Sequence, residues 1–446
     1  MEYRKSNNQR SSGGYRGNSG SSYGGSSRSS SSSGSSYGGR PSNGGSRYGG
    51  GSNSRSKFSS GGGRGRASNR GRFSTYIDEN KYIKKAKVQS ESKPFEPSFK
   101  YEELNVDPQL KQNILKKGFN NPTPIQDQGI PLAMAKKDIL GVANTGTGKT
   151  AAFLIPLVQK IINYRNEKVL IITPTRELAQ QINEELYELT RNLKIYSVEC
   201  TGGSPIYRQI SELRRGVSFV IGTPGRLLDL HKRNVIDYSR YTNLVLDEVD
   251  RMLDMGFIDD IKDIISYLPK ERQSLFFSAT MDRKVEDLIK VILKPDYQKV
   301  SVSTGVTAEN VEQNIVRFSG RDDKLKQLMD ILNQEKTEKT LIFVNTKRFV
   351  DQLEDELLDK GLRVSAIHGD KKQQQRRKAI EMFKTNRSNI LIATDVAARG
   401  LDIPNVSHVI NFDEPNNFED YIHRIGRTGR ADKSGIALTF VQKKGY

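Results

Sequence analysis

A glycine-rich loop in the first half of the chain has the residue types that bind nucleotide phosphates. Residues Ala143–Thr150 read ANTGTGKT, after the apolar run Ile139–Leu140 and before the helical stretch Ala151–Lys160. Glycines let backbone N–H groups approach phosphate oxygens, and a helix N-terminus adds positive potential. Lys149 supplies a charge for the β- and γ-phosphates, and Thr150 a hydroxyl for Mg²⁺. The loop starts with alanine where the general pattern has glycine, so an ordinary glycine-rich turn stays the alternative.

Two adjacent carboxylates lie 97 residues after Thr150. The apolar run Leu244–Leu246 predicts a strand, and Asp247 and Glu248 follow it directly. In a parallel sheet the carboxyl ends of the strands open onto the ligand crevice. Asp247 can hold Mg²⁺ there, largely through water, and Glu248 can polarise an attacking water. A surface acidic pair is the alternative, but the upstream loop favours ATP hydrolysis.

From Phe99 onward, predicted strands alternate with predicted helices, and these elements must position the residues described above. Short apolar or β-branched runs predict strands, and amphipathic stretches such as Glu177–Leu189 separate them. The runs are Val169–Ile172, Ile195–Cys200, Val217–Ile221, Leu244–Leu246, Ser274–Phe277, Val311–Phe318, Leu341–Val344, Val364–Ile367, Ile390–Ala393, Val409–Phe412 and Ile436–Val441. The pattern breaks at Lys294–Glu309. The sequence therefore predicts two α/β domains with parallel sheets, joined by a linker.

Charge narrows the class of partner. The chain of 446 residues has a formal net charge of +19, which favours a polyanion, either nucleic acid or an anionic membrane. No apolar run approaches the roughly 20 residues that span a bilayer, and the N-terminus lacks the apolar core of a secretory signal. We expect a cytoplasmic protein, or a nuclear one if it is eukaryotic. The single cysteine, Cys200, excludes an intrachain disulfide and is expected to be a structural residue on an apolar strand.

The N-terminal segment carries much of this charge. Residues 1–73 hold 11 Arg and 2 Lys against the single acid Glu2, a net charge of +12, in a Ser/Gly-rich background. Such a segment cannot bury enough apolar surface to offset its ordering entropy, so we expect disorder. Arg and interleaved Tyr can stack on unpaired bases while Arg neutralises phosphate. The tail is thus expected to add nucleic-acid affinity; a partnerless flexible tail, or one that drives condensation, is the alternative.

From about Phe99 to the C-terminus the sequence resembles the DEAD-box RNA helicases, because a dozen motifs occur in the family's order. The adenine-reading segment matches Gly118-Phe119 and Pro122–Gln126. The resemblance implies that Phe119 packs on adenine and that Gln126 reads its edge, while Phe99 takes the place of the family's upstream aromatic residue. It further implies the full set of nucleotide-binding residues: Phe119, Gln126, Ala143, Asn144, Thr145, Gly146, Thr147, Gly148, Lys149, Thr150, Gly400 and Asp402.

Further motifs imply RNA contacts and coupling. The matching segments are Pro174–Leu178, Gly202-Gly203, Thr223–Arg226, Ser278–Thr280, Leu341–Asn345, His368–Asp370 with Gln373 and Arg376, Ala393–Asp402 and His423–Arg430. By resemblance, RNA is bound by Pro174, Thr175, Arg176, Gly203, Thr223, Pro224, Gly225, Arg226, Gln373, Arg376 and Thr394. The resemblance also implies a set of residues that couples the ATP and RNA sites, namely Asp250, Ser278, Thr280 and His423. It implies that Arg427 and Arg430 serve as arginine fingers across the domains, and that the other catalytic residues are Lys149, Thr150, Asp247 and Glu248.

The resemblance implies two tandem RecA-like domains. We expect a tail at 1–73, a connector at 74–98, an ATP-binding domain at 99–295 with its adenine-reading segment at 99–127, a linker at 296–310 and a C-terminal domain at 311–446. The implied activity is local unwinding of RNA duplexes with ATP and Mg²⁺, by a monomer that binds single-stranded RNA with little sequence preference. Two features depart from the family: Val249 replaces the usual alanine of the signature tetrapeptide, and the closing helix usual after the last strand is not present before Tyr446.

Two other functions fit part of the pattern. A DNA-directed or protein-remodelling ATPase would share the two-domain layout, and equal stimulation by DNA and RNA, or by neither, would favour it. A non-catalytic RNA-binding scaffold would share the charge. The scaffold is disfavoured because the residues expected to hydrolyse ATP are all present, namely Lys149, Asp247, Glu248 and Arg430.

Overall fold

The computed structural model describes residues 79–85, 95–144, 146–302, 310–334, 338–398, 403, 405–429 and 434–443. Several predictions lie outside the described residues: the tail 1–73, most of the connector, residues 303–309 of the linker, and the roles of Thr145, Gly400, Asp402 and Arg430.

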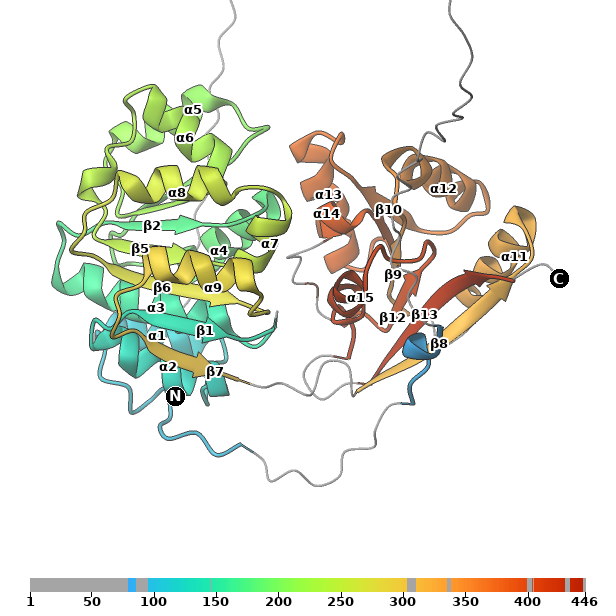
Figure 1. Cartoon of the computed structure of the whole chain (residues 1–446), viewed down its shortest axis with the longest axis horizontal. Coiled ribbons are helices and arrows are strands. Elements are labelled where there is room, and N and C mark those ends of the chain that lie inside the picture. Colours follow the sequence, from blue (N-terminus) through green and yellow to red (C-terminus); the bar gives the residue numbers. More distant parts are fainter. Residues whose placement is uncertain are drawn as a thin grey trace, which may run out of the picture. The chain divides into compact units, whose positions relative to one another are not determined.

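The first lobe, residues 95–302, alternates helices with strands (Figure 1). Its strands are β1 (Ile139–Val142), β2 (Val169–Ile172), β3 (Ser197–Cys200), β4 (Phe219–Gly222), β5 (Asn243–Leu246), β6 (Gln273–Ser278) and β7 (Gln298–Ser301). Its helices are α1 (Pro108–Lys116), α2 (Pro124–Met134), α3 (Lys149–Asn163), α4 (Arg176–Leu189), α5 (Ile206–Arg214), α6 (Pro224–Lys232), η2 (Tyr238–Arg240), α7 (Val249–Asp254), α8 (Ile258–Ser266) and α9 (Arg283–Ile292).

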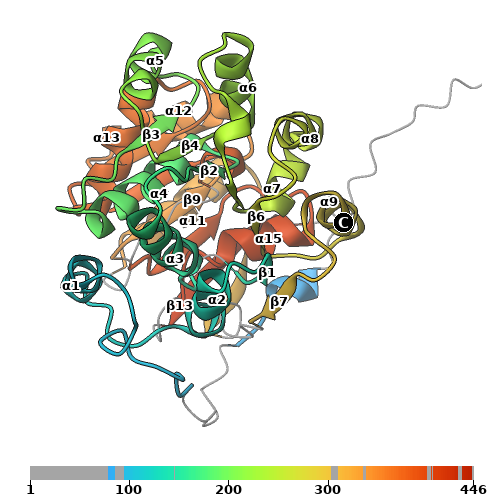
Figure 2. The ribbon, with the colours of Figure 1, turned by 90° about the vertical axis from the view of Figure 1, so that its left-hand side faces the viewer.

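All seven strands of this sheet are parallel, in the order β3-β4-β2-β5-β6-β1-β7. Neighbouring residues of a strand face opposite sides, so Ile171 joins a core with α1–α4 while Ile172 joins one with α6–α9. Figure 2 shows α3 and α4 on one side of the sheet and α7–α9 on the other. Because helices cover both faces, the carboxyl edge of the sheet is left to hold loops and their side chains.

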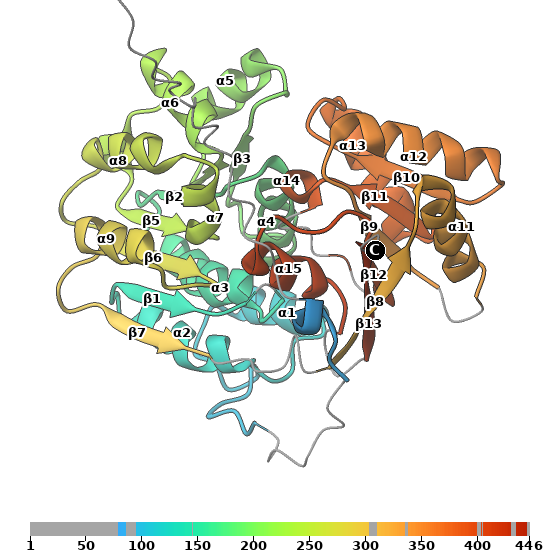
Figure 3. The same cartoon turned by 45° about the vertical axis from the view of Figure 1, so that its right-hand side comes forward.

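The second lobe, residues 310–443, repeats this plan. Its strands are β8 (Val311–Phe318), β9 (Thr340–Phe343), β10 (Val364–Ile367), β11 (Ile390–Ala393), β12 (His408–Asn411) and β13 (Gly435–Gln442). Its helices are α11 (Arg321–Leu332), α12 (Lys347–Asp359), α13 (Gln373–Lys384), α14 (Asp395–Ala398) and α15 (Phe418–Ile425). The parallel order is β10-β11-β9-β12-β13-β8, and a short 3-10 helix, η1 (Glu79–Tyr82), lies beside β8 (Figure 3).

The two parallel-sheet α/β lobes confirm the expected fold class. Each predicted apolar run forms a strand within two residues of its expected ends. Strand β7 was not expected, because it lies where the pattern breaks and only Val300 of its four residues is buried. It nevertheless pairs with β1, so the first sheet extends beyond the last apolar run.

Two further sequence predictions concern the role of Cys200 and the presence of membrane-spanning segments. Cys200 is a free, buried residue on β3, as expected for a structural cysteine, and burial raises the pKa of its thiol. Within the described ranges, no helix combines the length and the apolar character needed to cross a bilayer.

Candidate nucleotide and nucleic-acid site

The glycine-rich loop joins the end of β1 to the start of α3, as its sequence predicts. The Lys149 side chain is buried and its Nζ donates to the Ala143 carbonyl at 2.9 Å. Gly148 has a φ of 92°, and a Cβ there would overlap the Gln126 carboxamide. Glycine is thus required at 148 by both backbone conformation and close approach.

The paired carboxylates follow β5, which neighbours β6 and is one strand removed from β1. Asp247 and Glu248 are both buried. Burial raises the pKa of Asp247 to about 6, although Lys149 opposes the change. Burial also disfavours the charged form of Glu248, but Arg251, Lys149 and Arg427 together lower its pKa to about 2. Glu248 is therefore fully ionised at neutral pH.

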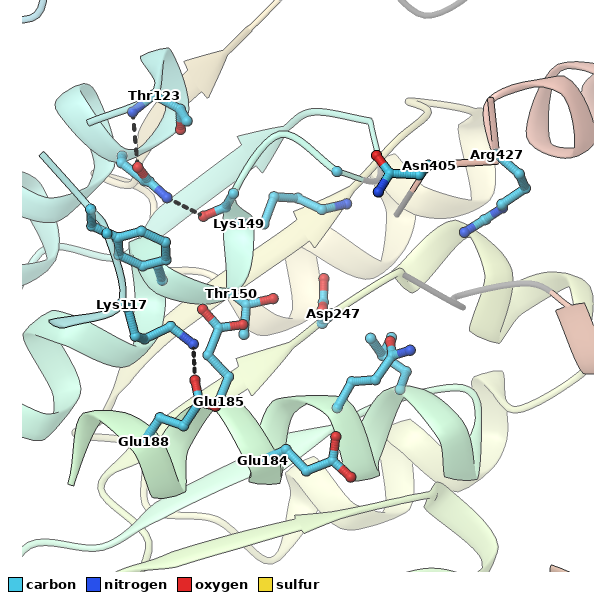
Figure 4. Close-up of a pocket in the computed structure, with 18 of the residues that line it drawn as sticks. Lys117, Thr123, Lys149, Thr150, Glu184, Glu185, Glu188, Asp247, Asn405 and Arg427 are labelled. Carbon is cyan, nitrogen blue, oxygen red and sulfur yellow. Dashed lines mark hydrogen bonds and ion pairs between the residues drawn. The ribbon is translucent and has the colours of Figure 1, made fainter. Parts of the chain in front are cut away.

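A cavity of about 950 Å³ lies in front of these groups and is lined by both lobes. Lys149, Thr150 and Asp247 contribute from the first lobe, and Arg427 from the second (Figure 4). We call this space the nucleotide cavity. Arg427, expected from the sequence as a finger residue, thus shares one cavity with the phosphate loop and the carboxylates.

Arg251 is a site residue that the motif analysis missed. Its Nη1 donates to Glu248 Oε2 at 2.9 Å, and its Nη2 donates to the Val396 carbonyl of the second lobe at 3.1 Å. The side chain is only 6% exposed, so the ion pair is shielded from water. Its spacing of three residues from Glu248, which suits an ion pair on one helix face, is the sequence signal that could have identified it.

Around the expected adenine subsite, Tyr101 contacts Gln126, whereas the sequence led us to expect the family's upstream aromatic residue at Phe99. Phe119 lines the nucleotide cavity, and its ring stacks with Tyr101 at a centroid distance of 5.9 Å. The Tyr101 hydroxyl donates to Gln126 Oε1 at 2.9 Å, while Phe99 packs against the core and its ring forms an edge-on pair with Tyr101 at a centroid distance of 6.0 Å. Gln126 Oε1 also accepts from the Thr123 N–H, and its Nε2 donates to the Gly148 carbonyl at 3.0 Å.

The residues expected to couple the sites are brought together. Asp250 Oδ2 accepts from the Thr280 N–H at 2.9 Å and from the Thr280 hydroxyl at 3.1 Å. The Asp250 N–H donates to Ser278 Oγ at 3.4 Å. The His423 ring of the second lobe lies within 4.8 Å of the Asp250 carboxylate. The carboxylate is therefore bonded to the segment that follows β6 and lies near His423 of α15.

The first-lobe residues expected to contact RNA share one half of the sheet edge. Thr175–Arg176 follow β2, Gly202–Gly203 follow β3 and Thr223–Arg226 follow β4, and these strands are neighbours. The Arg176 guanidinium lies against Gly203, where a side chain would overlap it. Pro174 is also buried beside this edge, and Pro224 starts α6. Loops at the carboxyl ends of β3, β4 and β2 thus form a surface separate from the phosphate loop.

The second-lobe residues expected to contact RNA, which are Gln373, Arg376 and Thr394, differ in their surroundings. Thr394 follows β11 and is 8% exposed. Arg376 Nη2 pairs with Glu177 Oε2 at 2.8 Å, and Gln373 Nε2 donates to the other oxygen of Glu177 at 3.3 Å. A second pair, Arg377 with Glu199, also joins the lobes at 3.0 Å. Glu177 stands in a motif that the sequence analysis assigned to RNA, but no partner could be named from sequence.

Comparisons with known proteins place this geometry in a family. Residues 123–288 match the DEAD/DEAH box helicase model, and residues 323–432 match the helicase conserved C-terminal domain. The chain is 44% identical over 345 residues to the DEAD-box ATP-dependent RNA helicase CshA of Bacillus subtilis strain 168, covering 76% of this chain and 69% of that protein. The chain belongs to the DEAD-box ATP-dependent RNA helicases. The resemblance seen in the sequence is confirmed.

Solved structures of DEAD-box helicases agree with the fold. S. cerevisiae Dbp5 bound to RNA and ADP BeF3 matches with a TM-score of 0.69 and 33% identity, covering 77% of this chain and 90% of that one. Mss116p bound to ssRNA and AMP-PNP matches with a TM-score of 0.70 and 30% identity, covering 77% and 75%. Both relatives hold RNA and a nucleotide at once.

Proposed function

We propose that this DEAD-box helicase is an RNA-stimulated ATPase that separates short RNA duplexes locally, with ATP held in the nucleotide cavity. The observation that carries the proposal is the shared lining of that cavity, with Lys149 and Glu248 from the first lobe and Arg427 from the second. Such a site is complete only when both lobes contribute, which links nucleotide chemistry to lobe closure.

The described residues divide the work on ATP. Phe119 and Gln126 meet the base, and the N–H groups at the start of α3 with Lys149 bind the phosphates. Glu248 stays ionised and can polarise the attacking water, because its pKa lies near 2. A guanidinium such as that of Arg427 stabilises charge on the transferred phosphoryl group, an effect worth roughly 10³–10⁵ in rate.

Thr150 and Asp247 fit a Mg²⁺ ion. Thr150 offers a hydroxyl, and Asp247 offers a buried carboxylate. Burial raises the pKa of Asp247 to about 6, so a bound cation would offset the cost of ionising this carboxylate. When bound, Mg²⁺ neutralises charge on the β- and γ-phosphate oxygens.

For RNA, the proposal rests on the loops after β2, β3 and β4. They present Thr175, Arg176, Gly203 and Arg226, whose hydroxyl, backbone and guanidinium groups suit phosphate and sugar contacts. Contacts to the backbone and 2′-OH give little sequence preference. Two relatives solved with RNA support this choice of ligand. We further propose that the basic tail adds affinity through its charge.

The deciding experiment measures ATP hydrolysis with single-stranded RNA, duplex RNA and DNA. Single-stranded RNA should stimulate wild type most, and Glu248→Gln should lower kcat by at least about a hundredfold while ATP still binds. Equal stimulation by DNA would favour a DNA-directed ATPase. No hydrolysis at saturating RNA would favour a non-catalytic scaffold, and wild-type turnover by the variant would refute the role of Glu248.

Deletion of residues 1–73 gives a separate test of the tail. The truncated chain should bind RNA more weakly at low salt, and its affinity should depend less steeply on salt concentration, because fewer phosphates are neutralised. Unchanged affinity at low salt would contradict an RNA-binding role for the tail.

A further inference from the structure

Residues 79–85 lie against the second lobe, although the first lobe follows them in sequence. The Lys84 N–H donates to the Gln313 carbonyl at 3.0 Å, and the Gln313 N–H donates to the Lys84 carbonyl at 2.8 Å. This antiparallel pair extends the sheet at β8, which is its edge strand. Figures 1 and 3 both show η1 beside β8. We call residues 79–85 the strap.

One aromatic side chain anchors the strap in the second-lobe core. Tyr82 is completely buried, and its ring lies 4.8 Å from that of Tyr421 at an interplanar angle of 58°. The two rings form one cluster with Val311, Ile425, Ala437 and Val441. The next residue, Ile83, is 50% exposed. An aromatic residue buried from a seven-residue segment indicates specific docking, since such burial removes a large apolar surface from water.

Polar contacts fix the rest of the strap. Glu79 Oε2 pairs with Arg317 Nη2 of β8 at 2.6 Å. The Lys81 ammonium lies 5.3 Å from the centre of the Phe418 ring, at the start of α15. The strap therefore touches two elements of the second lobe, its edge strand and α15.

Helix α15 connects the strap to the nucleotide cavity. The Tyr421 hydroxyl donates to Gln313 Oε1 at 2.9 Å, so Gln313 holds the strap with its backbone and α15 with its side chain. The helix ends at Ile425, and Arg427, two residues later, lines the nucleotide cavity. A shift of α15 must move Arg427, because Arg427 follows the helix by only two residues. Tyr82 can influence the position of α15, since it packs in one cluster with Tyr421 and Ile425 of that helix.

We propose that the strap is a positioning element for Arg427, with Tyr82 as its key residue, and that it sets α15 in the orientation needed for ATP hydrolysis. The inference rests on the proposed ATPase function. Nine residues separate Lys85 from Phe95, and that length spans at most about 36 Å, so the strap acts as an intramolecular ligand of the second lobe. Through residues 86–94 it also gives the lobes a second covalent connection beside the linker.

The test compares Tyr82→Ala, Tyr82→Phe and Ile83→Ala in the full-length chain. Tyr82→Ala should lower the kcat of RNA-stimulated ATP hydrolysis about five- to twentyfold, because Arg427 is misplaced rather than lost. The KM for ATP should change less than about twofold, since the base and phosphate-loop contacts belong to the first lobe. Tyr82→Phe keeps the ring and should behave as wild type, as should the exposed Ile83→Ala.

A double-mutant cycle separates positioning from general destabilisation. In an Arg427→Ala background, Tyr82→Ala should cause no further loss of kcat, because the residue through which the strap acts is gone. Hydrogen exchange of the Gln313 amide, which donates to the strap, should accelerate in Tyr82→Ala with or without Arg427. Additive losses of kcat in the double variant would overturn the proposal, as would wild-type kcat in Tyr82→Ala. If wild type itself fails to hydrolyse ATP, the proposed function is wrong, whereas the exchange measurement still reports whether the strap docks.

Discussion

Glu248 combines a strained backbone with an ionised side chain. Its φ of 54° and ψ of 55° lie in the left-handed region, which costs a non-glycine residue roughly 1–2 kcal/mol. Its carboxylate is held by Arg251, and Lys149 and Arg427 add positive potential. Strain of this kind persists where the surrounding structure fixes the conformation, and it is concentrated at functional sites. The ionised Glu248 carboxylate is thus held in a fixed conformation at the nucleotide cavity.

Tyr101 makes a testable contribution to the adenine subsite. Tyr101→Phe removes the hydroxyl that donates to Gln126 Oε1 and leaves the ring in place. The carboxamide is then held less firmly, so we expect the KM for ATP to rise about threefold to tenfold, equivalent to roughly 1 kcal/mol for one hydrogen bond. Steady-state ATPase assays at saturating RNA measure this change.

The matched control for that variant is Tyr238→Phe. Tyr238 is also fully buried, but in the described part of the chain its hydroxyl has no hydrogen-bond partner. The control should leave the KM for ATP unchanged. An equal KM in Tyr101→Phe and wild type would show that Gln126 needs no support from the hydroxyl.

Val249, the departure from the family's tetrapeptide, belongs to the core of the first lobe. Its side chain is fully buried among residues of α6–α9. Val249→Ala should therefore lower the free energy of unfolding of the first lobe by about 1–2 kcal/mol through lost apolar burial, while kcat changes less than about twofold. Urea denaturation with parallel ATPase assays tests this. Val291→Ala, at a position 57% exposed, should have little effect; a gain in stability at 249 would indicate that valine overpacks the core.

At the scale of elements, the strand order separates two kinds of chemistry on one edge. Strands β5, β6 and β1 carry the carboxylates, the Ser278–Thr280 segment and the phosphate loop. Strands β3, β4 and β2 carry the loops proposed to bind RNA. After β3 the chain turns back through β4, β5 and β6 toward β1, and ligands of open α/β sheets bind at the carboxyl edge near such reversals. Asp250, bonded to Thr280, lies in the ATP half and reaches toward α15.

The turn from β1 into α3 depends on Gly148. Gly148→Ala would place a methyl group against the Gln126 carboxamide at a φ of 92°, so both the loop and the adenine subsite must distort. We expect the KM for ATP to rise at least about tenfold. Gly361→Ala provides the control, since Gly361 has a φ of 79° but no atom within 4 Å of the added methyl. Equal ATP binding by both variants, measured by titration calorimetry, would exclude a special role for the close approach.

Sequence patterns predicted local elements well and distant partners poorly. Buried parallel strands such as β2 read as continuous apolar runs because both faces are covered, whereas β7 exposes three of its four residues and leaves no such signal. The phosphate loop and the Asp247–Glu248 pair are local motifs, so their placement was predictable. Tyr101, Arg251 and the strap were missed because their importance depends on contacts with residues 25 or more positions away, or in the other lobe.

At the scale of the whole molecule, charged side chains make several of the contacts between the described parts of the two lobes. Besides the Arg251 bond to Val396, they include Arg376 with Glu177 and Arg377 with Glu199. The Glu177 pair is buried on both sides, whereas the Arg377 side chain is 44% exposed. Exposed pairs are worth about 0–1 kcal/mol, but removing one partner of a buried pair can cost roughly 3–5 kcal/mol. Glu177 is therefore expected to dominate closure.

Glu177→Gln tests this expectation. The change leaves Arg376 without its counter-charge in the closed arrangement, so the open arrangement gains population. Because RNA and ATP are proposed to bind across closed lobes, the RNA concentration for half-maximal ATPase activity should rise at least about tenfold, the effect of roughly 1.4 kcal/mol. RNA titrations of ATPase activity measure it, with energy transfer between dyes on the two lobes as an independent readout of closure. Glu212→Gln, the same change at an exposed position of the first lobe, should match wild type. An unshifted RNA titration in Glu177→Gln would mean that closure does not depend on the buried pair.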